Sequence, residues 1–386
     1  MKNYFYLGII ISLVCGFSTS CQKENITPGS NAIPSDFNQI FEGFWNKMNQ
    51  NYVYWDVDTT EWDKIHYTFK PLFAKLDIHN NKDINTSVDY FKQMTKGMID
   101  GHLSLSFTSY PVKGSFIYPA LNKKVANKSF HSPYPYFAVD TNYLDNGFHS
   151  GYYITNDNQR LEVVCGLIHQ SILYFNCNLF ALKEAYLSQK DNSAKTCLLY
   201  FLNILHNYYP AIKEVIIDVR NNPGGNVEDL DFLIGQFIDN PLQFGYTRYK
   251  IGSGRLDYTP WIKAMITPQP GANVAKAPVV ALIDNYSISL SEAVAMSVHC
   301  LPNGVLIGET TWGATGPITN NVIYNDGSFN VPGFLSVYTS SAAFKYVNGK
   351  IYEGIGFPPD IAISVNASLV NAGTDQILDK AISLVQ

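Results

Sequence analysis

The sequence predicts an α/β fold with a small helical domain in front of it. Downstream of residue 160, short apolar runs with the length of buried strands alternate with stretches of helical periodicity, and this alternation is typical of an α/β core. Upstream, residues 36–101 place apolar side chains at helical spacing. A length of 386 residues predicts two or three domains of about 150 residues each, and the hydrophobic content of 46% allows a substantial core.

Residues 1–20 have the pattern of a signal peptide and are set apart from the fold. A basic start at Lys2 precedes an apolar run, residues 4–17, which is shorter than the about 20 residues of a membrane-spanning helix. Small residues then precede Cys21, as at a bacterial lipoprotein cleavage site. We therefore expect a lipid on Cys21 to anchor the protein to a membrane of a bacterial cell envelope, facing the periplasm or the surface. The alternative is an ordinary secretory signal with an incidental cysteine.

The chain after Cys21 is predicted to begin with a tether and a helical domain. Residues 21–35 are rich in Asn, Ser and Pro and are typical of a flexible linker. Residues 36–108 form the predicted helical N-terminal domain. Its clearest helical pattern consists of Phe37, Ile40, Phe41, Phe44, Trp45 and Met48. We expect these side chains to form core rather than a ligand site.

Residues 109–160 and 161–386 are predicted to form a connecting region and the α/β core. The connecting region is rich in Tyr, Phe, Ser, Pro and Asn, shows little periodicity, and is expected to be irregular or β-rich. The predicted core elements are strands at 161–168, 172–176, 214–220, 279–283 and 305–307, and helices at 182–206, at 230–238 and from 293.

The segment after the strand at 279–283 carries the strongest functional signal. Ser289 lies where this strand gives way to a helix. Free N–H groups and the dipole at a helix N-terminus favour negative charge, which suits a nucleophile whose reaction creates an oxyanion. Ser289 and Glu292 also fit the S-x-x-E capping box, in which the serine is simply an N-cap and the glutamate a first-turn cap.

A second turn supplies candidate oxyanion donors. The strand at 214–220 ends in a glycine-rich turn that contains Gly224 and Gly225. Paired glycines let the backbone approach a ligand closely and direct N–H groups inward. We predict an oxyanion hole made from the N–H of Gly224 or Gly225 and the N–H of Leu290, the residue after the candidate nucleophile.

Four ordered motifs resemble those of the C-terminal processing (tail-specific) serine peptidases and their tricorn-core-like relatives. They are D-x-R-x-N-x-G-G at 218–225, S-x-S-x-S-E at 287–292, G-E-x-T-x-G at 308–313 and E-x-x-G-x-x-P-D at 353–360. The resemblance covers roughly residues 36–386. It implies a crotonase/ClpP-like catalytic core behind a small helical domain, and serine peptidase activity without a cofactor.

The resemblance also implies the remaining catalytic residues. In the tail-specific branch a lysine 25 residues after the nucleophile is the general base, but Ala314 stands at that position here. The tricorn-like branch takes a histidine from an upstream D-x-H-type segment, which matches His102, and orients it with a glutamate, which matches Glu353. The resemblance thus implies a triad of Ser289, His102 and Glu353.

This assignment is chemically coherent. A serine hydroxyl is a weak nucleophile until a base takes its proton, an imidazole has a suitable pKa, and a carboxylate holds the tautomer of that imidazole. Asp100 and Asp284 remain alternatives to Glu353 as the orienting group. His299 would lie about 15 Å from Ser289 along a helix that rises about 1.5 Å per residue, so we do not expect it to be the base.

Other features are interpreted as structural. Asp218 and Arg220 are expected to form a charge pair that pins the end of their strand beneath the site. Many tail-specific relatives carry a PDZ domain before the core. Residues 109–160 are too few for one, so we predict that it is absent or severely reduced.

Composition and spacing argue against several classes of function. A net charge of −5 without a basic run argues against nucleic-acid binding. No dinucleotide or P-loop glycine fingerprint occurs. Cys165, Cys177, Cys197 and Cys300 lack metal-ligand spacing, so no metal is predicted.

We therefore expect a serine peptidase that acts on extracytoplasmic peptides or proteins by an acyl-enzyme mechanism. The alternative is a non-catalytic ligand- or peptide-binding lipoprotein on the same fold, which the missing lysine and the missing PDZ domain favour. A crotonase-type acyl-CoA enzyme would share only the architecture, and export from the cytoplasm argues against it.

Overall fold

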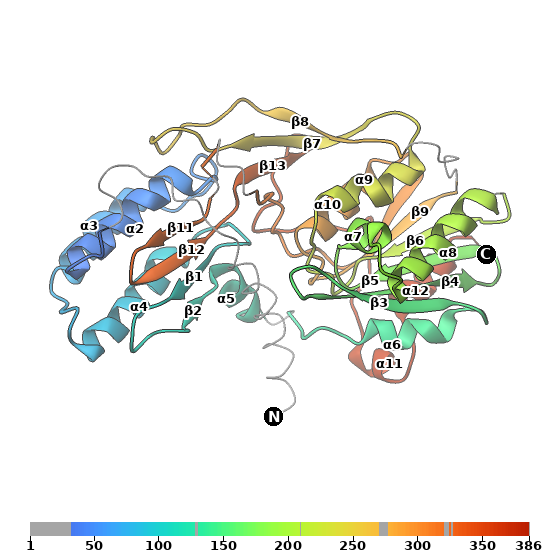
Figure 1. Ribbon diagram of the computed structural model, residues 1–386, viewed down its shortest axis with the longest axis horizontal. Helices are drawn as coiled ribbons and strands as arrows, with labels where there is room; N and C mark the ends of the chain where they lie inside the picture. Colours follow the sequence, from blue (N-terminus) through green and yellow to red (C-terminus); the bar gives the residue numbers. More distant parts are fainter. Residues whose placement is uncertain are drawn as a thin grey trace.

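The computed structural model describes residues 32–127, 130–208, 210–269, 277–319, 324–325 and 327–385. These residues form a front lobe and a rear lobe, with a three-stranded sheet lying across the top of both (Figure 1). The predicted signal peptide and Cys21 lie outside the described residues. Within the described ranges, no helix has the length and apolar character needed to cross a bilayer.

The front lobe begins with three amphipathic helices, α2 (Phe37–Asn51), α3 (Trp62–Phe73) and α4 (Asn81–Thr95). The Asp36 carboxylate caps α2 by accepting from the Gln39 N–H at 2.8 Å. The helices bury one aromatic cluster that includes Phe37, Phe41, Phe44, Phe73 and Phe91. The helices predicted from this periodicity are therefore present.

A four-stranded sheet completes the front lobe. In order across the sheet its strands are β11 (Phe329–Val331), β12 (Leu335–Tyr338), β1 (Ser104–Phe107) and β2 (Phe116–Ile117). Two of these strands come from the segment that the sequence analysis assigns to the core. Because Ser104 pairs antiparallel with Tyr338, the residues just before β1 lie beside those just after β12.

The rear lobe is built on a seven-stranded sheet. Its order is β14 (Ile361–Ala362), β10 (Gly304–Gly308), β9 (Val279–Ile283), β6 (Glu214–Asp218), β5 (Ile172–Cys177), β4 (Arg160–Ile168) and β3 (His149–Ile154). The five strands from β14 to β5 are parallel, and β4 and β3 are antiparallel.

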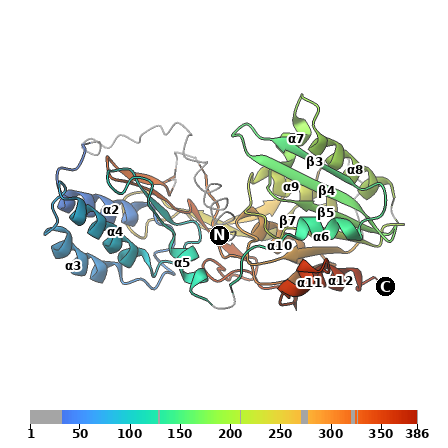
Figure 2. The same cartoon turned by 90° about the horizontal axis from the view of Figure 1, so that it is seen from below.

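Helices cover both faces of this sheet (Figures 1 and 2). On one side lie α7 (Leu182–Leu187), α8 (Ser193–Asn207), α9 (Glu228–Ile234) and α10 (Leu290–His299). The other side carries α6 (Tyr136–Asp140), α11 (Ala367–Asn371) and α12 (Gln376–Ile382). Along β6, Val215 and Ile217 join the first layer and Ile216 the second, as alternation along a strand requires.

The sheet across the top has the order β13 (Ala342–Tyr346), β7 (Leu242–Tyr249) and β8 (Ile262–Ile266). The loop between β7 and β8 reaches the front lobe, where Arg255 pairs with Asp63 of α3 at 2.5 Å. Below this sheet, the short helix α5 (Pro119–Val125) packs through Ala120 and Leu121 against the buried cluster that contains Trp312. Side-chain contacts made by the β7–β8 loop and by α5 therefore connect the two lobes, in addition to the backbone.

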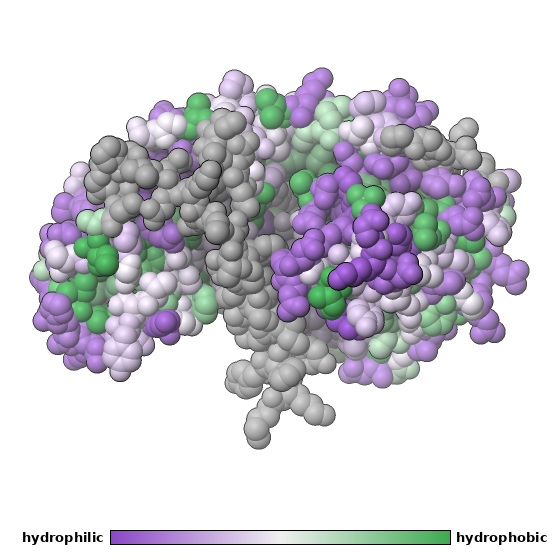
Figure 3. Space-filling view, viewed as in Figure 1, coloured by the Kyte–Doolittle hydropathy of each residue, from purple (hydrophilic) through white to green (hydrophobic). Residues whose placement is uncertain are grey.

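The α/β fold with a helical front region is confirmed, with local differences. The helix expected at 182–206 is two helices, α7 and α8, because the Asn192 side chain caps α8 by accepting from the Lys195 N–H at 2.8 Å. The connecting region 109–160 contains α5 and α6 in addition to strands. On the face shown in Figure 3, hydrophobic side chains of the coloured residues are scattered among polar ones.

Candidate active site

The serine turn and the glycine turn are joined at adjacent strand ends. β6 and β9 pair in parallel, so the segments that follow them leave the sheet side by side. The Ser287 hydroxyl donates to the Val219 carbonyl oxygen at 2.8 Å. The Asn222 carbonyl oxygen accepts from the Ser291 hydroxyl at 2.7 Å and from the Ile288 N–H at 3.0 Å. Three hydrogen bonds therefore fix one turn against the other.

Ser289 differs from the two serines that flank it. Ser287 and Ser291 are fully buried, whereas Ser289 is half-buried and has φ = 58°, a region that non-glycine residues seldom adopt. Such strain in a folded protein is concentrated at functional sites. Of the serines in the S-x-S-x-S motif, Ser289 alone combines partial exposure with a strained backbone.

The glutamate half of the capping box is also present. The Glu292 carboxylate accepts from the Ser289 N–H at 3.1 Å, and the Glu292 N–H donates to the Ser289 carbonyl oxygen at 2.9 Å. Neither of these two bonds uses the hydroxyl. The capping and the catalytic interpretations of Ser289 are therefore compatible.

The glycine turn touches the residue after the candidate nucleophile. A Cβ atom on Gly224, where φ is +99°, would lie 2.8 Å from the Leu290 nitrogen. The Gly224 N–H donates to the Asn222 side-chain oxygen at 2.8 Å. In the described part of the chain, no hydrogen bond is donated by the N–H of Gly225 or of Leu290. Of the two glycines predicted for an oxyanion hole, Gly225 is the one with an uncommitted donor.

Arg220 lies at the centre of a buried ionic network beneath these turns. Its guanidinium contacts Asp218 at 2.6 Å, Asp375 at 2.6 Å and Asp140 at 2.9 Å, and stacks 3.8 Å from the Tyr136 ring. These contacts support the structural interpretation of Asp218 and Arg220, because both side chains are directed into the protein and fully engaged there.

His102 lies at the front-lobe edge, two residues before β1. Its Nδ1 atom faces the Ser340 hydroxyl oxygen at 3.3 Å. The Asp100 carboxylate accepts from the His102 N–H at 2.8 Å and from the Ser340 hydroxyl at 2.9 Å. Burial lowers the pKa of His102, and the negative charge of Asp100 opposes that shift. The imidazole is consequently neutral, and able to accept a proton, at neutral pH.

Glu353 is buried beside His102 but bonds to other groups. One carboxylate oxygen accepts from the Gly101 N–H at 2.6 Å. The other accepts from the Tyr54 hydroxyl at 2.8 Å, from the Thr315 N–H and hydroxyl at 2.7 and 2.9 Å, and from the Gly316 N–H at 2.9 Å. Burial, followed by repulsion from Asp100, raises the pKa of Glu353 to about 8. The Glu353 carboxylate thus joins Gly101, the residue before His102, to Tyr54 and to the backbone at residues 315–316.

The lobes meet at Ala314, the position of the absent lysine. A Cβ atom on Gly101 would lie 2.6 Å from the Ala314 Cβ, and the Ala314 N–H donates to Glu292 at 2.7 Å. Glu292 also accepts from the Ser289 N–H. Ala314 therefore contacts both the segment that carries His102, through Gly101, and the segment that carries Ser289, through Glu292. No hydrogen bond between His102 and Ser289 occurs in the described structure.

The alternative bases and orienters occupy other surroundings. His299 faces the Tyr346 hydroxyl at 2.7 Å and Asp360 at 3.2 Å. Asp284 accepts from the N–H groups of Asn221 and Tyr286 at 3.1 and 2.9 Å. Asp100, in contrast, is next to the imidazole.

Sequence reasoning missed Ser340 and Tyr54. Ser340 lies in the link between β12 and β13, and Tyr54 follows α2. Both reach the site only through long-range pairing of the lobes, and no local motif marks either. The sequence predicts Glu292 as a first-turn cap, but its carboxylate also accepts from the Thr311 hydroxyl and the Gly313 N–H at 2.6 and 2.7 Å. It therefore organises the whole loop after β10.

Asp100, His102 and Glu353 bring potential metal-ligand atoms within 4.8 Å of one another. Both carboxylates, however, already accept several hydrogen bonds from N–H and hydroxyl groups. These donors satisfy the oxygens that a cation would need. The cluster is therefore better described as a hydrogen-bonded support for His102.

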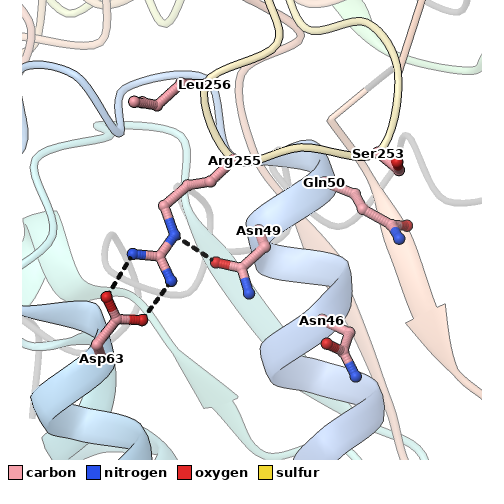
Figure 4. A pocket seen from close by; sticks show the side chains of 7 residues that line it. All are labelled: Asn46, Asn49, Gln50, Asp63, Ser253, Arg255 and Leu256. Atoms are coloured by element: carbon pink, nitrogen blue, oxygen red, sulfur yellow. Dashed lines mark hydrogen bonds and ion pairs between the residues drawn. The ribbon is translucent and has the colours of Figure 1, made fainter.

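A separate cavity of about 480 Å³ lies where the β7–β8 loop meets α2 and α3 (Figure 4). It is lined by Asn46, Asn49, Gln50, Asp63, Ser253, Arg255 and Leu256. The Arg255 guanidinium is already paired with Asp63 and bonded to the Asn49 side-chain oxygen at 2.7 Å. None of the candidate catalytic residues lines this cavity.

Comparison with known proteins agrees with the fold and the motifs. Residues 185–363 match the model of peptidase family S41, a range that includes Ser289, both glycines and Glu353 but not His102. The carboxy-terminal processing protease CtpA of Bacillus subtilis is 34% identical over 116 residues, which are 30% of this chain and 22% of that protein. The tricorn protease of Thermoplasma volcanium is 27% identical over 171 residues, 44% of this chain and 14% of that protein. This chain thus matches less than a quarter of either relative.

Solved structures extend the similarity in fold to nearly the whole chain. A crystal structure from Parabacteroides merdae, described as a candidate peptidase, has a TM-score of 0.69 at 23% identity and covers 91% of this chain and 97% of its own. Mature CPAF has a TM-score of 0.61 at 12% identity and covers 91% and 97%. The family match shows a peptidase family S41 domain at residues 185–363, and the solved structures show that the similarity in fold extends beyond it.

Proposed function

We propose that the protein is a serine peptidase that hydrolyses extracytoplasmic peptides or proteins through Ser289, His102 and Glu353. One observation carries the proposal. A half-buried serine with strained backbone geometry lies at the N-terminus of α10, against a glycine turn, and the N–H groups of Gly225 and Leu290 donate no hydrogen bond among the described residues. This is the arrangement that a nucleophile and an oxyanion hole require.

The proposed reaction begins when the Ser289 hydroxyl attacks the scissile carbonyl carbon. His102 accepts the hydroxyl proton, and the N–H groups of Leu290 and Gly225 stabilise the resulting oxyanion. The C–N bond then breaks, and His102 donates its proton to the leaving amine. Water then attacks the acyl carbon while His102 takes a proton from it. The bond between the acyl carbon and the Ser289 oxygen breaks, His102 returns the proton to that oxygen, and the acid is released.

Glu353 supports the base through the backbone in this proposal. Its bonds to Gly101 and to the N–H groups of Thr315 and Gly316 hold the segment before His102 against the loop after β10. No hydrogen bond joins His102 and Ser289 in the described structure, so we propose that substrate binding draws the lobes together. Catalytic hydrogen bonds commonly tighten only in the substrate complex.

The test of this proposal is labelling with a fluorophosphonate, which phosphonylates activated serines. The wild-type protein should be modified at Ser289, as located by mass spectrometry of its peptides. Ser289→Ala should abolish labelling, and His102→Ala should slow it by about 10²-fold or more. Ser287→Ala and Ser291→Ala each remove a buried hydroxyl that joins the two turns, so labelling should slow in these variants but remain on Ser289.

A folded wild-type protein that remains unlabelled at Ser289 would refute the peptidase proposal. That outcome would favour the second candidate, a peptide-binding lipoprotein without catalysis. The absence of a hydrogen bond between Ser289 and His102 in the described structure is the observation that keeps this candidate open. Binding without cleavage of a peptide library, measured by mass spectrometry of the recovered peptides, would identify it.

We also propose that a lipid on Cys21 holds the protein in a bacterial cell envelope. The proposal is supported by the basic start, the short apolar run and the small residues before Cys21. Cys21→Ser should move the protein from the membrane fraction to the soluble fraction. An unmodified Cys21 in the membrane-associated wild-type protein would contradict lipid anchoring.

A further inference from the structure

We propose that Asp100, acting through the Ser340 hydroxyl, fixes the tautomer and orientation of His102. This inference rests on the proposed function, because it assigns positioning residues to the proposed general base. It adds to Glu353 a second carboxylate with a different task. It also gives a role to Ser340, a residue outside the four sequence motifs at 218–225, 287–292, 308–313 and 353–360.

The direction of the hydrogen bonds carries the argument. The Ser340 hydroxyl has a single proton. It donates this proton to the Asp100 carboxylate, whose nearer oxygen lies 2.9 Å away and acts as an acceptor. The Ser340 oxygen is then left as an acceptor for His102 Nδ1, which lies 3.3 Å away. Nδ1 must therefore carry the ring proton, and Nε2 keeps the free lone pair that a general base needs.

The relay is held rigidly from several directions. Asp100 and Ser340 are both fully buried. One Asp100 oxygen accepts from the His102 N–H at 2.8 Å, and the other accepts from the Ser340 N–H at 2.8 Å and from the Thr339 hydroxyl. The antiparallel pairing of β1 with β12 places these two segments together. The hydrogen bonds between Asp100 and residues 339–340 therefore continue the contact between the two segments beyond the paired strands.

Asp100 is surrounded by hydrogen-bond donors, namely the N–H groups of His102 and Ser340 and the hydroxyls of Thr339 and Ser340. Around the imidazole, Asp100 and Glu353 are the acidic groups of the cluster. The nearby phenols of Tyr52, Tyr54 and Tyr338 have pKa values raised by burial and by Asp100, and so remain neutral donors. Burial and then repulsion from Asp100 raise the pKa of Glu353 to about 8.

Glu353 does not perform this task in the structure. Its oxygens accept from the Gly101 N–H, from Tyr54 and from the loop at 315–316. Among the described residues, the ring of His102 has its hydrogen bond with Ser340. We infer a division of labour in which Glu353 fixes the backbone beside His102, and Asp100 with Ser340 fixes its ring.

The first experiment reads the tautomer directly and does not need activity. Nitrogen-15 NMR of histidine side chains distinguishes a protonated ring nitrogen from a bare one, and His102→Gln identifies the signal among the eight histidines. In the wild-type protein at pH 8, His102 should carry its proton on Nδ1. Ser340→Ala should shift the signal toward a mixture of both tautomers. Ser340→Thr, which keeps a hydroxyl, should restore the wild-type pattern.

The second experiment measures hydrolysis of a peptide substrate or, in its absence, the rate of fluorophosphonate labelling. Ser340→Ala and Asp100→Asn should lower kcat by about 10²-fold and leave KM unchanged, because neither group is proposed to touch substrate. Asp100→Asn should also shift the acid limb of the pH profile to lower pH, since the Asp100 charge raises the pKa of His102. Ser341→Ala is the matched control, a buried serine that bonds to Thr319; it should change neither kcat nor the tautomer.

The outcomes separate this inference from the proposed function. A proton on Nε2 in the wild-type protein, or an unchanged tautomer in folded Ser340→Ala, would overturn the inference whether or not the protein is an enzyme. A wild-type protein with the predicted tautomer but no labelling of Ser289 would overturn the peptidase proposal and leave the relay intact. The nitrogen-15 NMR spectrum of the wild-type protein tests the inference even if a variant folds poorly.

Discussion

Three serines in alternate positions have different tasks because their surroundings differ. Ser287 and Ser291 are buried and donate to backbone carbonyl oxygens of the neighbouring strand end. Ser289, between them, has a positive φ and partial exposure. The motif predicted a site at these residues, and the structure supplies the physical reason why the middle serine is the candidate nucleophile.

Glu214, at the start of β6, is a buried acid outside the site. Only 1% of its surface is exposed, and its Oε1 atom has no hydrogen-bond partner among the described residues. Burial raises the pKa of Glu214 from 4.5 to about 8. Because the folded-state pKa exceeds the unfolded value, the protonated side chain stabilises the fold fully below pH 4.5. This contribution is lost as the pH rises through 8.

Glu214→Gln should therefore remove part of the pH dependence of stability. At pH 9 the variant should be more stable than the wild type by about 1–2 kcal/mol, and near pH 4 the two should be similar. Urea unfolding at both pH values measures the difference. Glu61→Gln, which changes an exposed glutamate, is the control and should differ little from the wild type in free energy of unfolding at either pH. An equal pH dependence for wild type and Glu214→Gln would contradict the assignment.

At the scale of elements, two strand-end turns create the candidate site. Local sequence suffices to predict them, because an apolar strand, a glycine or serine turn and a following helix are all encoded within about 20 residues. The choice between Gly224 and Gly225 could not be made from sequence. It depends on the Asn222 side chain, which occupies the Gly224 N–H.

The glycine turn gives a prediction about steric space. Gly224→Ala should slow labelling of Ser289 by about 10²-fold or more, because the new Cβ would displace the Leu290 N–H that is proposed to bind the oxyanion. Gly349→Ala is the control, since φ there is also positive, at +85°, but no atom lies within 4 Å of the added Cβ. It should cost about 1 kcal/mol of stability and leave labelling unchanged. Wild-type labelling of folded Gly224→Ala would exclude the proposed oxyanion hole.

At the scale of the whole molecule, the candidate site is assembled from both lobes. The rear lobe contributes Ser289 and the glycine turn, and the front lobe contributes Asp100 and His102. The resemblance was needed to connect His102 with Ser289, because 187 positions separate them in the chain (289 minus 102). Periodicity predicted the helices of the front lobe and the strands of the core.

Long-range pairing explains what sequence reasoning could not reach. β12 joins the front sheet although it lies more than 200 residues after β1, and this pairing brings Ser340 to His102. Tyr54 likewise meets Glu353 across 299 positions. No local pattern encodes such contacts, since each depends on how two separately folded segments pack.

The central claim is that His102 of the front lobe activates Ser289 of the rear lobe. Its most direct test is a crystal structure of the fluorophosphonate adduct. We predict a bond between phosphorus and the Ser289 oxygen, a phosphonyl oxygen bound by the N–H groups of Gly225 and Leu290, and His102 Nε2 within about 3.2 Å of the Ser289 oxygen. An adduct on another residue, or an adduct on Ser289 with His102 beyond hydrogen-bonding reach, would contradict the claim.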